Sequence, residues 1–207
     1  MSEATDKWSA PKSGEHYAGA RFASARAAGR DPRTVRRLLE RHGVRGPVLD
    51  APCGTGRLAN TLASFGARVV SLDLSASMLA SARASLPGAA LQGSVHALPF
   101  RDRAFDVVVS CRFLHHLHER EARAAALREL VRVSERLLVA SFWDTASWPA
   151  LRVRLGLRRD EGPRGRTACS RAEIAELVEL AGFRVLDHAT GLRFVSQQTF
   201  FVAERVR

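Results

Sequence analysis

The sequence predicts an α/β domain built on a doubly wound, mostly parallel sheet. Short apolar runs of strand length alternate with amphipathic segments of helix length along most of the 207 residues. This alternation places helices on both faces of a parallel sheet. The last two apolar runs, 183–187 and 199–204, have no helical segment between them. We expect them to pair as an antiparallel hairpin, because a parallel pair needs a long crossover.

The other elements follow the same logic in chain order. Apolar runs predict strands ending at Asp50, at Asp73 and at Ser110, with two more within 91–100 and 136–142. Amphipathic spacing predicts helices over residues 31–42, 57–65, 75–86, 119–132 and 170–181. Asp31 before Pro32, and Ser75, are expected N-terminal caps, and Ser170 with Glu173 forms a capping box.

The most informative segment is the loop after the first predicted strand, which reads Val-Leu-Asp-Ala-Pro-Cys-Gly-Thr-Gly over residues 48–56. Two glycines two positions apart allow backbone N–H groups to approach a ligand that any Cβ would repel. The helix behind them adds partial positive charge. Asp50 adds a carboxylate directly before the turn. The combination suits a ligand that carries both an ammonium and a carboxylate group.

This loop resembles motif I of the class I S-adenosylmethionine-dependent methyltransferases. The resemblance continues in order over roughly residues 44–142. It takes in the strand that ends at Asp73, the Ser-Ala-Ser-Met-Leu segment of 75–79, the Leu-Pro-Phe of 98–100 and the strand over 105–110. It implies a Rossmann-like, seven-stranded sheet with an antiparallel C-terminal edge hairpin, and S-adenosylmethionine as cofactor. The cofactor-binding residues that it implies are Asp50, Ala51, Cys53, Gly54, Thr55, Gly56, Asp73, Leu74, Met78, Ser94, Val95 and Cys111.

Three positions depart from the family pattern. Gly93-Ser94-Val95 stands where the family usually has Gly-Asp-Ala, whose Asp bonds the adenine amino group. Pro52 replaces a common Gly. The usual Pro-Gly-Gly turn before the fifth strand is shortened to residues 133–135.

Three residues are candidates for the catalytic side of the site. His116 and His115 follow the fourth strand, and His can act as a general base near neutral pH. Tyr17 is the one tyrosine in the chain, and similar enzymes often cover the cofactor with an N-terminal helix that carries a Tyr. Trp143 and Trp148 are candidates for an apolar acceptor pocket. Packing roles for all five remain open, because methyl transfer needs alignment more than it needs an acid or a base.

Charge and cysteine content give weaker indications about partners and compartment. The formal net charge is +11, and the excess is arginine, clustered over 21–45 and over 152–171. Such clusters attract anionic partners, among them nucleic acid, or are solvated faces. The three cysteines fit no metal-ligand spacing, and we expect free thiols, no metal and a cytoplasmic protein. No apolar run approaches the roughly 20 residues of a membrane span.

The sequence therefore predicts a flexible segment over residues 1–30, which could act as a lid, and one methyltransferase domain over 31–207 with an insertion at about 143–170. The expected reaction is methyl transfer from S-adenosylmethionine to a small-molecule acceptor, anionic or apolar, at an O, N or C atom. Two alternatives stay open. The arginine clusters would suit an RNA-directed methyltransferase. The Gly54-x-Gly56-x-x-Ala59 spacing also fits a dinucleotide-dependent oxidoreductase.

Overall fold

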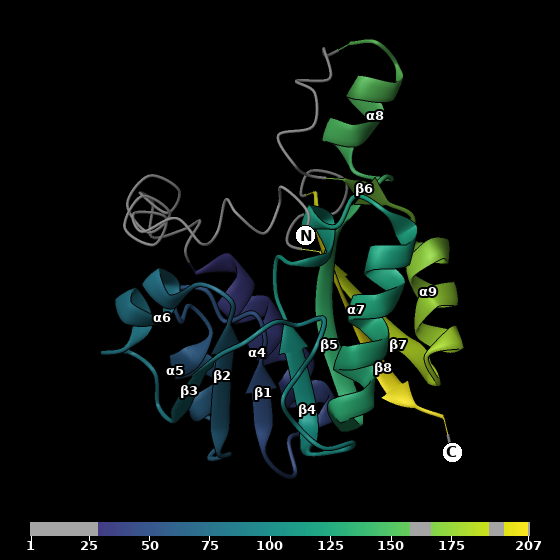
Figure 1. Cartoon of the computed structure of the whole chain (residues 1–207). Helices are drawn as coiled ribbons and strands as arrows, with labels where there is room; N and C mark the ends of the chain where they lie inside the picture. The colour runs from purple at the N-terminus through teal and green to yellow at the C-terminus, as the bar shows by residue number, and fades with distance from the viewer. Residues whose placement is uncertain (1–28, 158–166, 191–196, 207) are drawn as a thin grey trace.

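A central sheet of eight strands organises the computed structural model, which describes residues 29–157, 167–190 and 197–206 (Figure 1). The strand order is β3-β2-β1-β4-β5-β8-β7, with β6 paired to β5. The strands are β1 (Val48–Asp50), β2 (Val69–Asp73), β3 (Ala89–Gln92), β4 (Phe105–Ser110), β5 (Ser134–Asp144), β6 (Ala168–Cys169), β7 (Phe183–Thr190) and β8 (Gln198–Arg205). β8 runs antiparallel to both of its neighbours, and the other pairs are parallel.

The helices of the described residues cover both faces of this sheet. They are α4 (Arg30–His42), α5 (Ala59–Ala63), α6 (Ala76–Ala82), α7 (Arg120–Val133), α8 (Trp148–Arg154) and α9 (Arg171–Leu180), with a 3₁₀ turn η1 (Leu114–His116). Figure 1 shows α7 and α9 on one side of the sheet, with α4 behind it. Two apolar clusters explain the arrangement, since alternate residues of a strand point to opposite faces. Val108 and Leu138 pack with the leucines of α7, whereas Val107 and Val139 pack with those of α4.

The predicted fold class is confirmed, with one addition. β7 and β8 form the expected antiparallel hairpin at the edge of the sheet. β7 is the edge strand, and β8 lies between β5 and β7. The additional strand is β6, which comes from the 143–170 segment and pairs with the end of β5, at Trp143 and Asp144. A strand of two residues carries no periodicity, so the sequence could not have indicated it. The same segment contributes α8.

Several helix boundaries differ from the expected ones. Ser75 and Ser170 cap their helices as predicted, with each Oγ accepting a backbone N–H three residues on. The N-cap of α4, however, is Gly29, so the assignment of Asp31 as its cap is wrong. Asp31 is buried and binds two arginines that are distant in the sequence. The expected flexible segment over 1–30 lies outside the described residues except for 29–30, where Arg30 already begins α4. Within the described residues, no helix is both long and apolar enough to span a membrane.

Candidate active site

A cavity of about 220 Å³ opens at the carboxyl ends of β1, β2 and β4. This edge is the switch point of the sheet, since β2 and β4 flank β1 on opposite sides, and open α/β sheets bind their ligands there. The cavity is lined by Asp50, Pro52, Cys53, Gly54, Thr55, Arg57, Leu58, Asp73, Leu74, Met78, Gly93, Ser94, Val95, His96, Cys111, Arg112, Phe113, His116 and Leu117. The lining thus combines carboxylates, guanidinium groups and apolar side chains.

The glycine loop forms one wall of the cavity. Gly54 has a φ of 55°, a backbone conformation that L side chains rarely adopt, and a Cβ built on it meets no atom within 4 Å. Its N–H donates to the Asp73 carboxylate at 2.8 Å, which ties the loop to the end of β2. Gly56 also has a positive φ, 73°, but its Cβ position faces α6, 3.3 Å from Ala82 Cβ. Gly54 therefore leaves space for a ligand, whereas Gly56 allows the loop to pack on a helix.

Asp50 is an unpartnered carboxylate on the floor of the cavity. It is 1% exposed, and neither of its oxygens has a hydrogen-bond partner among the described residues. Burial raises the pKa of Asp50 to about 8, and the nearby charge of Asp73 adds to the rise. A buried carboxylate without a partner is costly, so this position favours a ligand that brings a cation. An ammonium group on the ligand would meet that requirement.

Asp73 is oriented by the backbone around it. One carboxylate oxygen accepts from the Ser75 N–H at 2.9 Å and the other from the Gly54 N–H at 2.8 Å. Burial raises the pKa of Asp73, and the backbone N–H groups oppose this only in part. Each carboxylate oxygen can accept a further bond, because a carboxylate offers about four lone-pair sites. Asp73 can therefore accept hydrogen bonds from ligand hydroxyl groups while it holds the loop.

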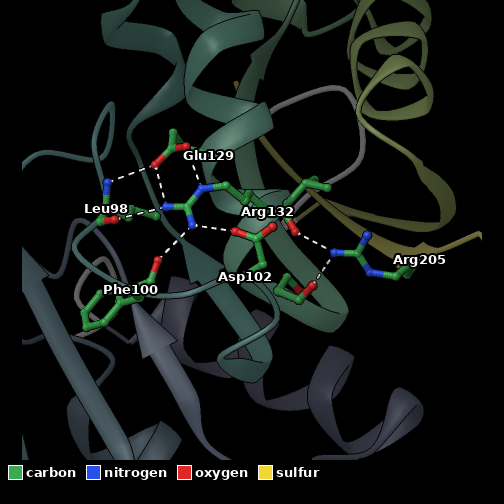
Figure 2. Close-up of polar contacts among 8 residues, drawn as sticks. Leu98, Phe100, Asp102, Glu129, Arg132 and Arg205 are labelled. Atoms are coloured by element: carbon green, nitrogen blue, oxygen red, sulfur yellow. Dashed lines mark hydrogen bonds and ion pairs between the residues drawn. The ribbon is translucent and has the colours of Figure 1, made fainter.

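A second wall of the cavity is formed by the start of the loop over residues 93–104, which α7 holds in place (Figure 2). Glu129 accepts the Leu98 N–H at 2.9 Å, and the Arg132 guanidinium donates to the carbonyls of Leu98, at 3.0 Å, and Phe100, at 2.8 Å. Arg132 also pairs with Glu129 at 2.8 Å. These bonds fix the chain immediately after Ser94, Val95 and His96, which line the cavity.

The structure brings most of the predicted cofactor residues to this cavity. Those that line it are Asp50, Cys53, Gly54, Thr55, Asp73, Leu74, Met78, Ser94, Val95 and Cys111, together with His116 among the catalytic candidates. Their contacts with a cofactor stay predictions. The two other predicted cofactor residues do not line the cavity: Ala51 is fully buried in the apolar core, and Gly56 packs on α6. A direct contact of either with a ligand is not supported by its position.

The two remaining catalytic candidates have different outcomes. His115 is 2% exposed, and its ring stacks on Trp143 with the ring centroids 4.9 Å apart. It does not line the cavity, so its position favours a packing role. Tyr17 lies outside the described residues, so its role stays a prediction. Neither Trp143 nor Trp148 lines the cavity, and Trp148 is 48% exposed.

The cavity is also lined by residues outside the set of predicted site residues. They include Arg57, Arg112 and Phe113, and Asp31 binds both arginines from the start of α4. Arg57 had one available signal, its position directly after the glycine loop. Arg112 has a φ of 60°, which no motif indicates for an arginine.

All three cysteines are free, as expected. Burial raises the pKa of the Cys111 thiol to about 12 and that of Cys53 further still. Both thiols line the cavity but are protonated near neutral pH, so neither is poised as a nucleophile. Among the described residues, no cluster of His, Cys, Asp or Glu could hold a metal ion.

Comparisons with known proteins agree with this geometry. A family model described as a methyltransferase domain matches residues 49–136. An uncharacterized methyltransferase of Synechocystis is 32% identical over 152 residues, which cover 67% of each protein. The chain belongs to the class I S-adenosylmethionine-dependent methyltransferases. A demethylmenaquinone methyltransferase of Beutenbergia cavernae is 35% identical to this methyltransferase over 116 residues, which are 56% of this chain and 47% of that protein.

Solved structures show the same fold for this methyltransferase. The magnesium protoporphyrin IX methyltransferase of Synechocystis, crystallised with S-adenosylmethionine, superimposes with a TM-score of 0.76. The match covers 100% of this chain and 99% of that one, at 19% identity. In contrast, the match covers only about half of the length, 45–56%, of several curated relatives.

Family membership removes the oxidoreductase alternative, and the sheet of the methyltransferase gives a physical reason. The dinucleotide-binding fold has the strand order 3-2-1-4-5-6 with parallel strands. Here the antiparallel β8 lies between β5 and β7.

Proposed function

We propose that this protein binds S-adenosylmethionine in the cavity at the ends of β1, β2 and β4, and transfers its methyl group to a small-molecule acceptor. The observation that carries the proposal is Asp50, a buried carboxylate with no partner among the described residues, beside an open glycine loop. The cofactor's ammonium group complements Asp50, and its ribose hydroxyls complement Asp73. Family membership supports the same cofactor.

The residues of the chain hold and align the cofactor. Bound S-adenosylmethionine supplies an electrophilic methyl group on a sulfonium. Asp50 accepts hydrogen bonds from the ammonium, and the Asp73 carboxylate, held by Gly54 and Ser75, accepts them from the ribose. Leu74 and Met78 line the same cavity as Asp73, and their apolar side chains would cover the adenine. Fixing both ends of the cofactor orients the methyl group, and orientation supplies much of the rate in such a displacement.

The acceptor approaches from the side of the cavity that η1 borders. Phe113, His116 and Leu117 line that side, so it combines apolar surface with one imidazole. His116 accepts a proton from the acceptor where the acceptor atom must lose one. The demethylmenaquinone methyltransferase relative supports a small-molecule acceptor. The free thiols support the cytoplasmic location expected from the sequence.

An RNA acceptor remains a second candidate because of one specific feature, the exposed face of α4. Arg30, Arg33, Arg36, Arg37 and Arg41 are all exposed on this helix, and Glu40 is the one acidic residue among them. Their spacing places them on one face. A tRNA affinity that falls steeply between 50 and 200 mM salt and persists at 150 mM would favour RNA.

The proposal is tested by titrating the protein with S-adenosylhomocysteine and, separately, with NADH in a calorimeter. We expect saturable binding of S-adenosylhomocysteine and none of NADH. Purified protein and tritiated cofactor are then added to a small-molecule extract and to a total RNA fraction. Label transferred into the small-molecule fraction supports the proposal. Label in the RNA alone would transfer the assignment to the RNA candidate, and a failure to bind S-adenosylhomocysteine would refute the function.

A further inference from the structure

Three charged side chains from separate parts of the chain meet at the cavity. Asp31 lies in the first turn of α4, Arg57 directly follows the glycine loop, and Arg112 follows β4. Arg57 Nη2 and Arg112 Nε both donate to Asp31 Oδ2, at 2.7 and 2.5 Å. The Asp31 side chain is 3% exposed, and the arginines are 18% and 23% exposed. One buried carboxylate thus fixes two guanidinium groups that both line the cavity.

This cluster adjoins the floor of the cavity at Asp50. Burial is the largest cause of the raised pKa of the Cys111 thiol. The charges of Asp31 and Asp50 raise this pKa further, whereas those of Arg57 and Arg112 lower it. The charge of Arg57 also lowers the pKa of Asp50, against the effect of burial. The two arginines, Asp50 and Cys111 all line the same cavity.

The backbone conformation of Arg112 also points to a binding role. Its φ of 60° is uncommon for a residue with a side chain and costs energy. The Ser141 hydroxyl on β5 accepts the Arg112 N–H at 2.8 Å and stabilises this conformation. Such outliers concentrate at binding sites, where the surrounding structure maintains them. In this conformation Arg112 Nε donates to Asp31, and the Arg112 side chain lines the cavity.

The chemistry of an amino acid explains why these charges lie side by side. An α-ammonium and an α-carboxylate are attached to the same carbon atom, so the groups that bind them must be neighbours. Asp50 suits the ammonium, and an arginine presents a planar fork of donors that suits a carboxylate. We infer that Arg57 and Arg112, held by Asp31, form the binding site for the α-carboxylate of the bound cofactor. The inference rests on the proposed function, because it assigns the other half of the same ligand.

The test compares three ligands by calorimetry. S-adenosylhomocysteine carries both charged groups, its decarboxylated analogue keeps only the ammonium, and 5′-methylthioadenosine has neither. We expect the unmodified protein to bind S-adenosylhomocysteine about 10- to 100-fold more tightly than the decarboxylated analogue, the effect of a charge-assisted hydrogen bond. In Arg57→Gln and in Arg112→Gln, this ratio should fall at least threefold. The affinity for 5′-methylthioadenosine should stay within about twofold in both variants, since a lost carboxylate contact leaves the adenosine contacts intact.

Controls separate this inference from the proposed function and from misfolding. Arg128 is an exposed arginine on α7 away from the cavity, and Arg128→Gln should keep the full ratio. If Arg57→Gln does not fold, Arg57→Lys and Arg112→Gln measure the same ratio. Equal binding of S-adenosylhomocysteine and its decarboxylated analogue by the unmodified protein, or an unchanged ratio in both arginine variants, would overturn the subsite alone. Absence of any S-adenosylhomocysteine binding would overturn the proposed function instead.

Discussion

Cofactor binding should release a proton from Asp50. With a pKa of about 8, roughly nine-tenths of the Asp50 carboxyls are protonated at pH 7 in the free protein. An ammonium group within hydrogen-bond distance favours the ionised form, so the pKa must fall when the cofactor binds. We therefore expect about 0.9 proton to leave the protein at pH 7 and about 0.1 at pH 9. Over the same range, the association constant should rise roughly fiftyfold between pH 6 and pH 8 and then level off.

The assay is a titration with S-adenosylhomocysteine in buffers of different ionisation enthalpy, which reports the number of protons exchanged. The matched variant is Asp50→Asn, which keeps the shape of the side chain but cannot ionise. Other titratable side chains, Asp73 among them, line the same cavity. The difference in proton release between the unmodified protein and the variant therefore isolates the contribution of Asp50. The variant should bind more weakly, with an affinity that no longer rises from pH 6 to 8. A release below about 0.2 proton at pH 7, or equal releases from both proteins, would refute the reasoning.

The same pKa predicts an effect on stability without ligand. Its folded value lies above the unfolded value of 3.8, so the contribution to stability is complete below about pH 4 and is lost as pH rises towards 8. Asp50→Asn should therefore raise the melting temperature of the free protein at pH 8 and leave it nearly unchanged at pH 4. Calorimetry at the two pH values checks this. A variant that melts lower than the unmodified protein at pH 8 would contradict it.

Three further predictions follow from the contacts around the site. Gly54→Ala should lower the affinity for S-adenosylhomocysteine at least tenfold, because the added Cβ enters the ligand space. Gly56→Ala should mainly lower the melting temperature, because the added Cβ meets α6. Equal effects of the two variants on affinity and on melting temperature would contradict the distinction. Arg132→Ala should weaken binding of S-adenosylhomocysteine and of 5′-methylthioadenosine alike, and a loss confined to S-adenosylhomocysteine would oppose its role in holding the 93–104 loop. Burial raises the pKa of Asp106, but Arg136 and two backbone N–H groups lower it more, so the folded-state pKa lies below the usual value. Asp106→Asn should therefore destabilise the protein by about 2–4 kcal/mol near pH 7. Urea unfolding should show a smaller loss as the pH falls through this lowered pKa.

Local patterns were sufficient to predict most of the sheet, β6 excepted, and the positions of the two carboxylates of the site. Asp50 and Asp73 each end a continuous apolar run, so their positions at one edge of a parallel sheet followed from strand direction. Gly54 was predictable because only a residue without Cβ gives backbone this access. Ser75 and Ser170 were predictable as caps, since their bonds span three residues.

What the sequence could not predict depends on contacts between distant segments. Asp31 stands directly before a proline, where a cap is the local expectation, but Arg57 and Arg112 bind it from 26 and 81 residues away. Gly56 was assigned to the ligand because its spacing matched. The partner that requires a glycine there is α6, which only the folded structure shows. His115 and His116 are adjacent in sequence, and the η1 turn sends one to the core and the other to the cavity.

A crystal structure with S-adenosylhomocysteine tests the central claim most directly. We expect the ligand in the cavity beside the glycine loop, with its ammonium nitrogen about 2.7–3.2 Å from an Asp50 carboxylate oxygen and its ribose hydroxyls on Asp73. A ligand bound at another place, or one whose ammonium group points away from Asp50, would contradict the account.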